Sequence, residues 1–242
     1  MATLHFTLTI DGLKDESLVV RGFEGNESLS EEVYQGSACY GFRYLIDLAS
    51  RKSNITPEQV VDKKAELHIY KNGELVQRVH GIVRNFSQGD IGHNHTFYSL
   101  TLVPALERLS LRHNSRIFQF KNSVDIVSIL LKEMGIQDFS FALTRTCLPR
   151  EFCVQYRETD LAFLQRLAAE EGWVYSFVHE AGKHMLQFSD STKLLPLLGG
   201  AIPYNGTAGG TIESSYISAL TKRTQSAHDE VALKDYSFKN PS

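Results

Sequence analysis

The sequence predicts an α+β fold that is mainly β. We expect an antiparallel barrel-like domain in residues 1–105, a mixed α+β segment in 106–205 and the start of a second barrel-like domain in 206–242. Three observations predict this order. The first part alternates polar and apolar side chains in many short stretches. Two helical patterns flanked by strand patterns follow, and strand patterns resume after a glycine-rich loop at 203–210.

The first strands can be read from alternation and turn residues. His5 to Ile10 alternates, Asp11-Gly12 can turn, and Leu18 to Phe23 can return, which predicts a hairpin. Cys39 to Leu48 is a second long strand candidate. Its expected buried face consists of Phe42, Tyr44, Ile46 and Leu48.

Two local motifs fix the middle of this first part. Thr56-Pro57-Glu58-Gln59 predicts a short helix, with threonine as the cap and a glutamine that reaches back to it. Asn72-Gly73 lies between two apolar-rich stretches, and a type I′ turn needs positive φ at both of its central residues. We therefore expect a hairpin whose second strand runs towards Phe86. A further strand, Tyr98 to Leu102, stops before Pro104.

The α+β segment contains two predicted helices. Ser123 is the expected cap of the first, in which apolar residues recur at helical spacing until Gly135 ends it. Thr159 is the expected cap of the second, and Gly172 can end it in the left-handed conformation. Leu161, Leu164, Leu167 and Ala168 share one face of this second helix. A hairpin that turns at Glu180 to Lys183 follows it.

Strand patterns resume near the end, at Tyr216 to Thr221, Val231 to Leu233 and Tyr236 to Phe238. So few strands cannot close a core of their own. Either the remainder of this domain lies in residues beyond 242, or these strands complete a sheet made elsewhere in the chain. We favour the first alternative and expect residues 206–242 to be a truncated domain.

Composition narrows the functional classes. The 242 residues are 42% hydrophobic and 22% charged, with a net charge of −3, which gives no electrostatic argument for binding nucleic acid. No apolar run approaches the roughly 20 residues that span a bilayer, and the first residues do not resemble a signal peptide. Cys39, Cys147 and Cys153 lack metal-ligand spacing and predict reduced thiols in a cytosolic protein.

The sequence identifies no catalytic, cofactor-binding or metal-binding residue. His93 and His95 invite a metal-dependent hydrolase interpretation, but no nearby Cys, Asp or Glu completes a ligand set, and a surface loop between two strands is preferred. Glu170-Glu171 points in two directions on a helix and predicts a solvated face beside Arg166. Cys153 is expected to be a packed small hydrophobe, and Trp173 to pack in the core.

Several longer motifs resemble one family in the same order along the chain. They are Tyr40 to Tyr44, His80 to Val83, Leu109 to Gln119, Arg150 to Asp160, Phe163 to Gly172 and Leu233 to Phe238. Together they resemble VgrG, the spike protein of bacterial type VI secretion systems, whose amino-terminal region is similar to the hub of contractile phage tails.

This resemblance implies a structural role and no enzymatic activity. In the family three chains form a ring, and each chain contributes two barrel-like domains. The ring therefore has pseudo-sixfold symmetry, which would match a hexameric ring of Hcp, the tail-tube protein. The implied partners are the other chains of a homotrimer in the full-length protein, the Hcp hexamer, the baseplate and effector proteins, without nucleic acid. The implied location is the bacterial cytoplasm before the secretion system contracts. The protein is then secreted into the medium or injected into a target cell. An adaptor that binds an effector is the remaining alternative.

Overall fold

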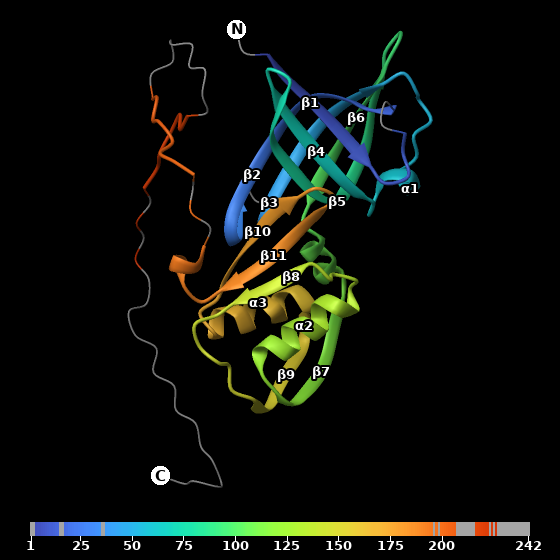
Figure 1. Ribbon diagram of the computed structural model, residues 1–242. Helices are drawn as coiled ribbons and strands as arrows, with labels where there is room; N and C mark the ends of the chain where they lie inside the picture. Colours follow the sequence, from blue (N-terminus) through green and yellow to red (C-terminus); the bar gives the residue numbers. More distant parts are fainter. Residues whose placement is uncertain are drawn as a thin grey trace, which may run out of the picture. The chain divides into compact units, whose positions relative to one another are not determined.

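A computed structural model describes residues 3–14, 17–34, 37–195, 197, 199–206, 216–222, 224 and 226 (Figure 1). Residues 2–196 form one compact unit, and residues 197–242 belong to a second, smaller unit. The larger unit contains both a sheet of six strands and an α+β part. The domain limits expected at 105/106 and 205/206 stay predictions.

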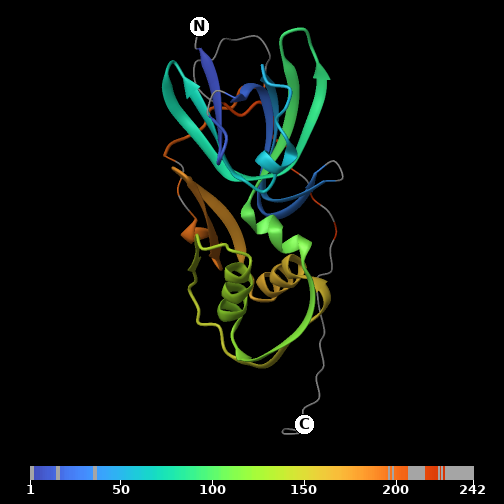
Figure 2. The ribbon, with the colours of Figure 1, turned by 90° about the vertical axis from the view of Figure 1, so that its right-hand side faces the viewer.

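The first part of the larger unit is a six-stranded antiparallel sheet with the strand order β1-β4-β5-β6-β3-β2. Its strands are β1 (Leu4–Ile10), β2 (Val19–Tyr34), β3 (Ser37–Ser50), β4 (Lys64–Lys71), β5 (Glu74–Ile91) and β6 (Thr96–Val103). The sheet curls so that its edge strands β1 and β2 approach each other (Figures 1 and 2). Among the described strands these two do not pair, so the sheet is barrel-like without being a closed barrel.

The prediction of a hairpin that turns at Asp11-Gly12 is wrong. β1 pairs with β4, placing Leu8 opposite Leu67, and β2 pairs with β3 instead. The turn itself forms, because Leu13 N–H donates to Ile10 O at 3.0 Å, but Asp11 N–H then donates to Lys64 O at 2.9 Å. The backbone groups at the end of β1 are thus satisfied by β4. A local turn signal could not reveal that competing strand.

The other local expectations for this sheet are confirmed. All four residues of the expected inner face of β3 are buried. Asn72 and Gly73 have φ of 53° and 85°, as a type I′ turn requires. Helix α1 (Pro57–Val60) begins after Thr56, whose N–H donates to Gln59 Oε1 at 3.0 Å. The sheet encloses a core that includes Leu8, Phe42, Ile46, Leu67 and Leu100.

The α+β part surrounds a second core. Its elements are η2 (Ala105–Leu111), β7 (His113–Lys121), α2 (Ser123–Glu133), β8 (Phe139–Ala142), β9 (Arg150–Thr159), α3 (Asp160–Glu170), β10 (Val174–Glu180), β11 (Lys183–Ser189) and η3 (Thr192–Leu194). β10, β11 and β8 form one sheet, in which β11 and β8 are parallel, and β7 pairs with β9 as a separate antiparallel ribbon. Helices α2 and α3 contact each other and bury their apolar faces in this core (Figure 2). The mainly β, α+β fold class is confirmed.

The cap of α2 differs from the expectation by one residue. Asn122, not Ser123, is the N-cap, and its Oδ1 accepts from Asp125 N–H at 2.8 Å. The Ser123 hydroxyl instead donates to Glu171 Oε1 at 2.7 Å. Both residue types cap helices well, so the nearby carboxylate decides which one does so here.

The start and end of α3 agree with the sequence. The Thr159 hydroxyl accepts from Ala162 N–H at 3.0 Å. Gly172 has a φ of 67°, and Trp173 N–H donates to Ala168 O at 2.7 Å, which closes the helix end. Trp173 is then buried in the core, as expected.

Gly172→Val is expected to lower the free energy of unfolding by about 1–2 kcal/mol, because a β-branched residue must adopt left-handed backbone there. A Cβ at this position meets no atom within 4 Å, so the cost comes from the backbone alone. Urea unfolding at pH 7 measures it. Gly22→Val is the matched control: its Cβ site is equally open and its φ is not positive, so we expect little change. Equal effects of the two substitutions would contradict a backbone cost at Gly172.

The smaller unit has less strand than the sequence predicts. Instead of a strand over Tyr216 to Thr221, the described residues form one parallel bridge between Tyr204 and Ile217. Ile217 N–H donates to Pro203 O, and Asn205 N–H donates to Ile217 O, both at 2.9 Å. No described neighbour extends this ladder, so alternation alone overestimated the strand. The strands expected at 231–233 and 236–238 lie outside the described residues.

Among the described residues, no helix has the length and apolar character that crossing a membrane requires.

Candidate functional site

Three histidines connect the six-stranded sheet to the β10–β11 hairpin. His80 comes from β5, His179 from β10 and His184 from β11. His80 Nδ1 lies 2.9 Å from His184 Nδ1, and the His80 N–H donates to His179 Nδ1 at 3.2 Å. His184 Nε2 accepts from Ala105 N–H, at the start of η2, at 3.0 Å. We call this group of three the histidine joint.

The hydrogen bonds assign the proton positions of the joint. Because His184 Nε2 accepts from a backbone N–H, neutral His184 carries its proton on Nδ1 and donates it to His80 Nδ1. Burial lowers the pKa of His184 to about 3, and the neighbouring imidazoles act in the same direction. Burial also lowers the pKa of His80 and of His179. All three rings are therefore neutral at pH 7.

Aromatic rings surround the joint. Phe42 packs edge-to-face on Phe177, with ring centroids 5.2 Å apart, and also on His179 at 4.8 Å. Phe177 contacts the apolar cores of both parts of the unit. Gly41, with a φ of 110°, leaves the space that the Phe177 ring occupies, and any Cβ there would collide with the ring. The joint is thus a packed, largely apolar connection in which both ring nitrogens of His184 are hydrogen-bonded.

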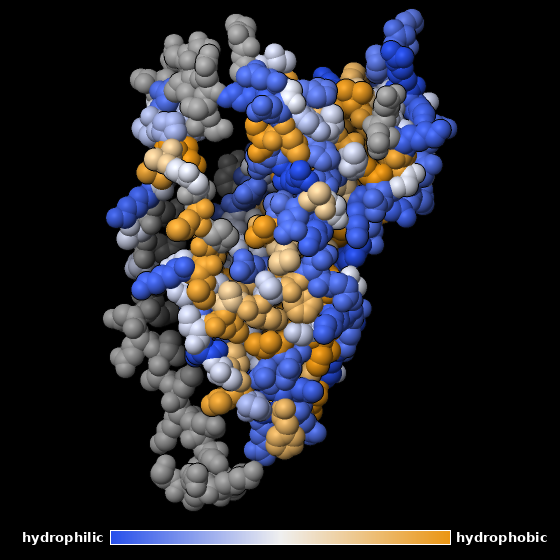
Figure 3. All heavy atoms as spheres, in the orientation of Figure 1, coloured by the Kyte–Doolittle hydropathy of each residue, from blue (hydrophilic) through white to orange (hydrophobic). Residues whose placement is uncertain are grey.

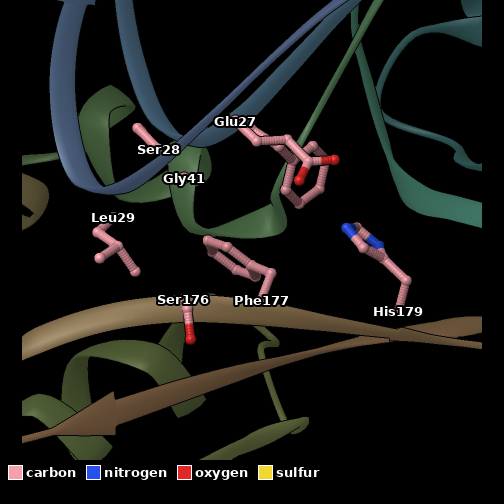
Figure 4. A pocket seen from close by; sticks show the side chains of 8 residues that line it. Glu27, Ser28, Leu29, Gly41, Ser176, Phe177 and His179 are labelled. Atoms are coloured by element: carbon pink, nitrogen blue, oxygen red, sulfur yellow. The ribbon is translucent and has the colours of Figure 1, made fainter. Parts of the chain in front are cut away.

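Three pockets formed by described residues have a histidine of the joint in their lining. One of about 290 Å³ is lined by Glu27, Ser28, Leu29, Gly41, Phe42, Ser176, Phe177 and His179 (Figure 4). His179 cannot take a proton from a serine in this pocket through Nδ1, since His80 N–H occupies that lone pair and the proton of the neutral ring is then on Nε2. The other two pockets, of about 190 and 160 Å³, have both cationic and anionic groups in their linings. Lys64 lines both, with Arg108 and Asp138 in the larger one and Glu66 in the smaller one.

A buried carboxylate lies beside the joint. Glu107 of η2 is 4% exposed and lies 3.4 Å from the guanidinium groups of both Arg43 and Arg84. Burial raises the pKa of this carboxyl, although the two arginines act against the shift. A further contact ties the β10–β11 turn to β4, because Gly182 N–H donates to Glu66 Oε2 at 2.9 Å.

A second polar network is centred on Asp160, the fully buried first residue of α3. Its Oδ2 accepts from Arg112 Nε at 2.5 Å, and its Oδ1 accepts from Gln155 Nε2 at 2.7 Å. Arg116 Nε donates to Gln155 Oε1 at 3.1 Å. Arg112 and Arg116 also bind Glu133 of α2, at 2.6 and 3.0 Å. The network therefore connects η2 and β7 with both helices and β9.

Four of the motifs that carry the family resemblance lie at these two places. The joint contains His80, from the motif His80 to Val83. Gly41, Phe42 and Arg43, which lie around the joint, come from the motif Tyr40 to Tyr44. Leu109 to Gln119 and Arg150 to Asp160 supply the network around Asp160. The motif at 233–238 lies outside the described residues. These stretches thus specify how the elements are fixed to each other.

The residues that the sequence analysis considered for catalysis or metal binding lie outside the histidine joint. His93 and His95 are exposed in the loop between β5 and β6, as expected, and the described residues contain no group of three or more potential metal ligands. Glu170 pairs with Arg166 and Arg150, and Glu171 pairs with Arg145 and Arg150. The three cysteines are free and buried, and burial raises the pKa of each thiol.

The sequence did not identify the histidine joint. His80 and His184 are 104 positions apart, and neither has a motif that indicates a partner. The one available signal was that His80 lies in one of the family motifs. The role of Gln155 was partly visible, since alternation placed it on the same face as Cys153, and both are buried.

Comparison with known proteins identifies the family. The family described as phage tail baseplate hub (GPD) matches residues 39–242. The chain is 66% identical over 242 residues to the actin cross-linking toxin VgrG1 of Vibrio cholerae serotype O1, covering all of this chain and 22% of that protein. It is 61% identical over 242 residues to the type VI secretion system spike protein VgrG3 of Vibrio cholerae, again covering all of this chain and 24% of that protein. The chain thus spans about a quarter of the length of these curated relatives.

A solved structure agrees with this result. An Escherichia coli component of the type VI secretion system, described as structurally similar to the bacteriophage T4 tail proteins gp27 and gp5, aligns with a TM-score of 0.66 and 28% identity. The alignment covers 77% of this chain and 49% of the other. The curled sheet and the α+β part are therefore those of a tail hub. The chain belongs to the phage tail baseplate hub family, among the VgrG spike proteins of type VI secretion systems.

Proposed function

We propose that this chain forms a non-enzymatic hub that assembles as a homotrimer and docks on the hexameric Hcp tube, so that a spike and its effectors can be delivered. The observation that carries the proposal is the match of residues 39–242 to a tail baseplate hub family. A three-chain ring in which each chain contributes two barrel-like domains would present sixfold pseudo-symmetry to a hexamer. The first of these domains would be the curled sheet, and the second would begin in residues 206–242.

The internal connections support a structural role. A hub must transmit force between tube and spike, so its parts should not hinge freely. Here the sheet and the α+β part share the histidine joint, the Phe42–Phe177 contact and the ion pair between Arg43 and Glu107. These connections are well suited to a rigid body.

The same proposal includes location. The spike would be assembled in the bacterial cytoplasm, together with the baseplate, and then be secreted or injected. The actin cross-linking named for one relative is not extended to this chain, because the chain covers 22% of that protein.

Binding to Hcp tests the proposal. Purified chain is mixed with a purified Hcp hexamer and analysed by sedimentation velocity, with an unrelated protein of similar mass as the control. We expect a new, faster species that contains both proteins only in the Hcp mixture. Failure to co-sediment at tens of micromolar of each protein would contradict Hcp docking by this part of the spike.

A further inference from the structure

An exposed apolar surface covers the outer face of the β7–β9 ribbon. Ile117, Phe152, Val154 and Tyr156 alternate with residues that face the core, and Phe120 adds a fifth apolar side chain. Phe120 is 73% and Tyr156 65% exposed. Apolar side chains are visible at the surface around these strands (Figure 3). A cluster of large exposed apolar side chains usually marks an interaction site. We call these five residues the aromatic ribbon.

Backbone strain occurs at both ends of the aromatic ribbon. Phe120 has a φ of 51° and Arg157 a φ of 49°, values that non-glycine residues adopt at a cost. At one end this conformation turns the Phe120 ring out to solvent. At the other, Arg157 lies over the ring of Tyr156, with its Cζ 5.2 Å from the centroid. Conformations of this kind persist where the surrounding structure holds them, and they cluster at functional sites.

The charges on this face are positive. Lys121 and Arg157 form no ion pair with a described residue. Glu158 is neutralised by Arg166, 2.7 Å away. Strand alternation places Glu151 with Cys153 and Gln155, on the opposite face. The matching partner surface should therefore combine exposed apolar side chains with free carboxylates.

Such a surface exists on the same chain, along β2. This strand is an edge of the six-stranded sheet and carries four glutamates. Glu27 accepts from the Tyr44 hydroxyl at 2.5 Å and Glu31 accepts from Gln165 Nε2 at 2.9 Å, whereas Glu24 and Glu32 form no ion pair or side-chain hydrogen bond with a described residue. Leu29 of the same strand is 54% exposed, and Val33, next to Glu32, is 66% exposed. We call this segment, residues 24–33, the acidic edge. Carboxylates also protect an edge strand from unspecific pairing, but that role needs no exposed Leu and Val.

The two surfaces lie on different parts of the unit (Figures 1 and 2), so one chain can offer each of them to a different neighbour. We infer that the acidic edge of one chain binds the aromatic ribbon of a second copy. A contact between two different surfaces is head-to-tail, and it closes a ring of three chains when the rotation between neighbours is one third of a turn. This inference rests on the proposed homotrimer, for which it names the contact surfaces.

A charge-swap series tests the inference by sedimentation velocity over a concentration range. One variant carries Lys121→Glu and Arg157→Glu, and another carries Glu24→Lys and Glu32→Lys. We expect each variant to self-associate at least tenfold more weakly than the wild type at low salt. A third variant with all four substitutions restores opposite charges across the contact, and we expect it to regain association.

Two controls distinguish this contact from a general effect of charge and from loss of the fold. Arg51→Glu with Lys193→Glu makes the same charge change at exposed positions outside both surfaces, and it should leave association unchanged. Circular dichroism and melting temperature verify the fold of every variant. If the wild type associates and neither two-site variant weakens it, or the four-site variant does not recover, the inference is overturned while the hub proposal stands. A wild type that stays monomeric at all concentrations also overturns the inference, and Hcp binding then decides on the hub separately.

Discussion

Replacing Asp160 with alanine is expected to lower the free energy of unfolding by about 3 kcal/mol or more, because it leaves buried polar groups without a partner. Asp160 is fully buried and accepts from both Arg112 and Gln155. Without it, the buried amide of Gln155 loses its closer acceptor and keeps only the 3.3 Å hydrogen bond to Glu158 O. Urea unfolding of the full chain, followed by fluorescence of Trp173, measures the effect.

Glu158→Gln is the matched control for this substitution. Glu158 also binds an arginine, Arg166 at 2.7 Å, but the side chain of Arg166 is 43% exposed. Pairs of this kind contribute about 0–1 kcal/mol. The burial of the carboxylate, and not the pairing itself, should therefore decide the size of the loss. Similar losses for Asp160→Ala and Glu158→Gln would contradict the claim that burial of the carboxylate decides the size of the loss.

Acidification from pH 7 to pH 5 is expected to lower the free energy of unfolding by about 2 kcal/mol through His184 alone. Its pKa is about 3 in the folded chain and about 6.5 when unfolded. Below pH 6.5 the unfolded chain therefore binds a proton that the folded chain does not, and stability falls with decreasing pH. The lowered pKa values of His80 and His179 act in the same direction. The raised pKa of Glu107 acts in the opposite one.

His184→Gln isolates this contribution, since glutamine does not titrate and its side-chain oxygen can still accept from Ala105 N–H. We expect the loss between pH 7 and pH 5 to be about 2 kcal/mol smaller in this variant than in the wild type. The double variant His93→Gln, His95→Gln changes two exposed histidines and should keep the wild-type loss. An equal loss in the wild type and His184→Gln would mean that His184 titrates normally in the folded chain.

The sequence predicted what depends on neighbouring residues. The Asn72-Gly73 turn, the Thr159 cap and the Gly172 helix end each follow from the backbone needs of a few adjacent positions. The choice of Asn122 over Ser123 as the N-cap of α2 depends on a distant residue, Glu171, which accepts from the Ser123 hydroxyl. The expected first hairpin failed for the same reason, because β4 competes successfully for β1.

The connection between the two parts of the unit could not be predicted in this way. His80, His179 and His184 become partners only when β5 lies against the β10–β11 hairpin. A histidine carries no sequence signal of its own that tells whether it is exposed, as His93 is, or buried, as His80 is. The acidic edge and the aromatic ribbon were likewise hidden, because alternation does not tell which face of a ribbon is covered.

The mass of the purified chain in solution tests most directly whether this part of the spike carries the assembly surfaces. Light scattering coupled to size exclusion, repeated over a concentration range, gives that mass without reference to shape. We predict three times the chain mass of 27.2 kDa at high concentration and low salt. A constant mass of one chain under all conditions would contradict trimer assembly through this part of the spike.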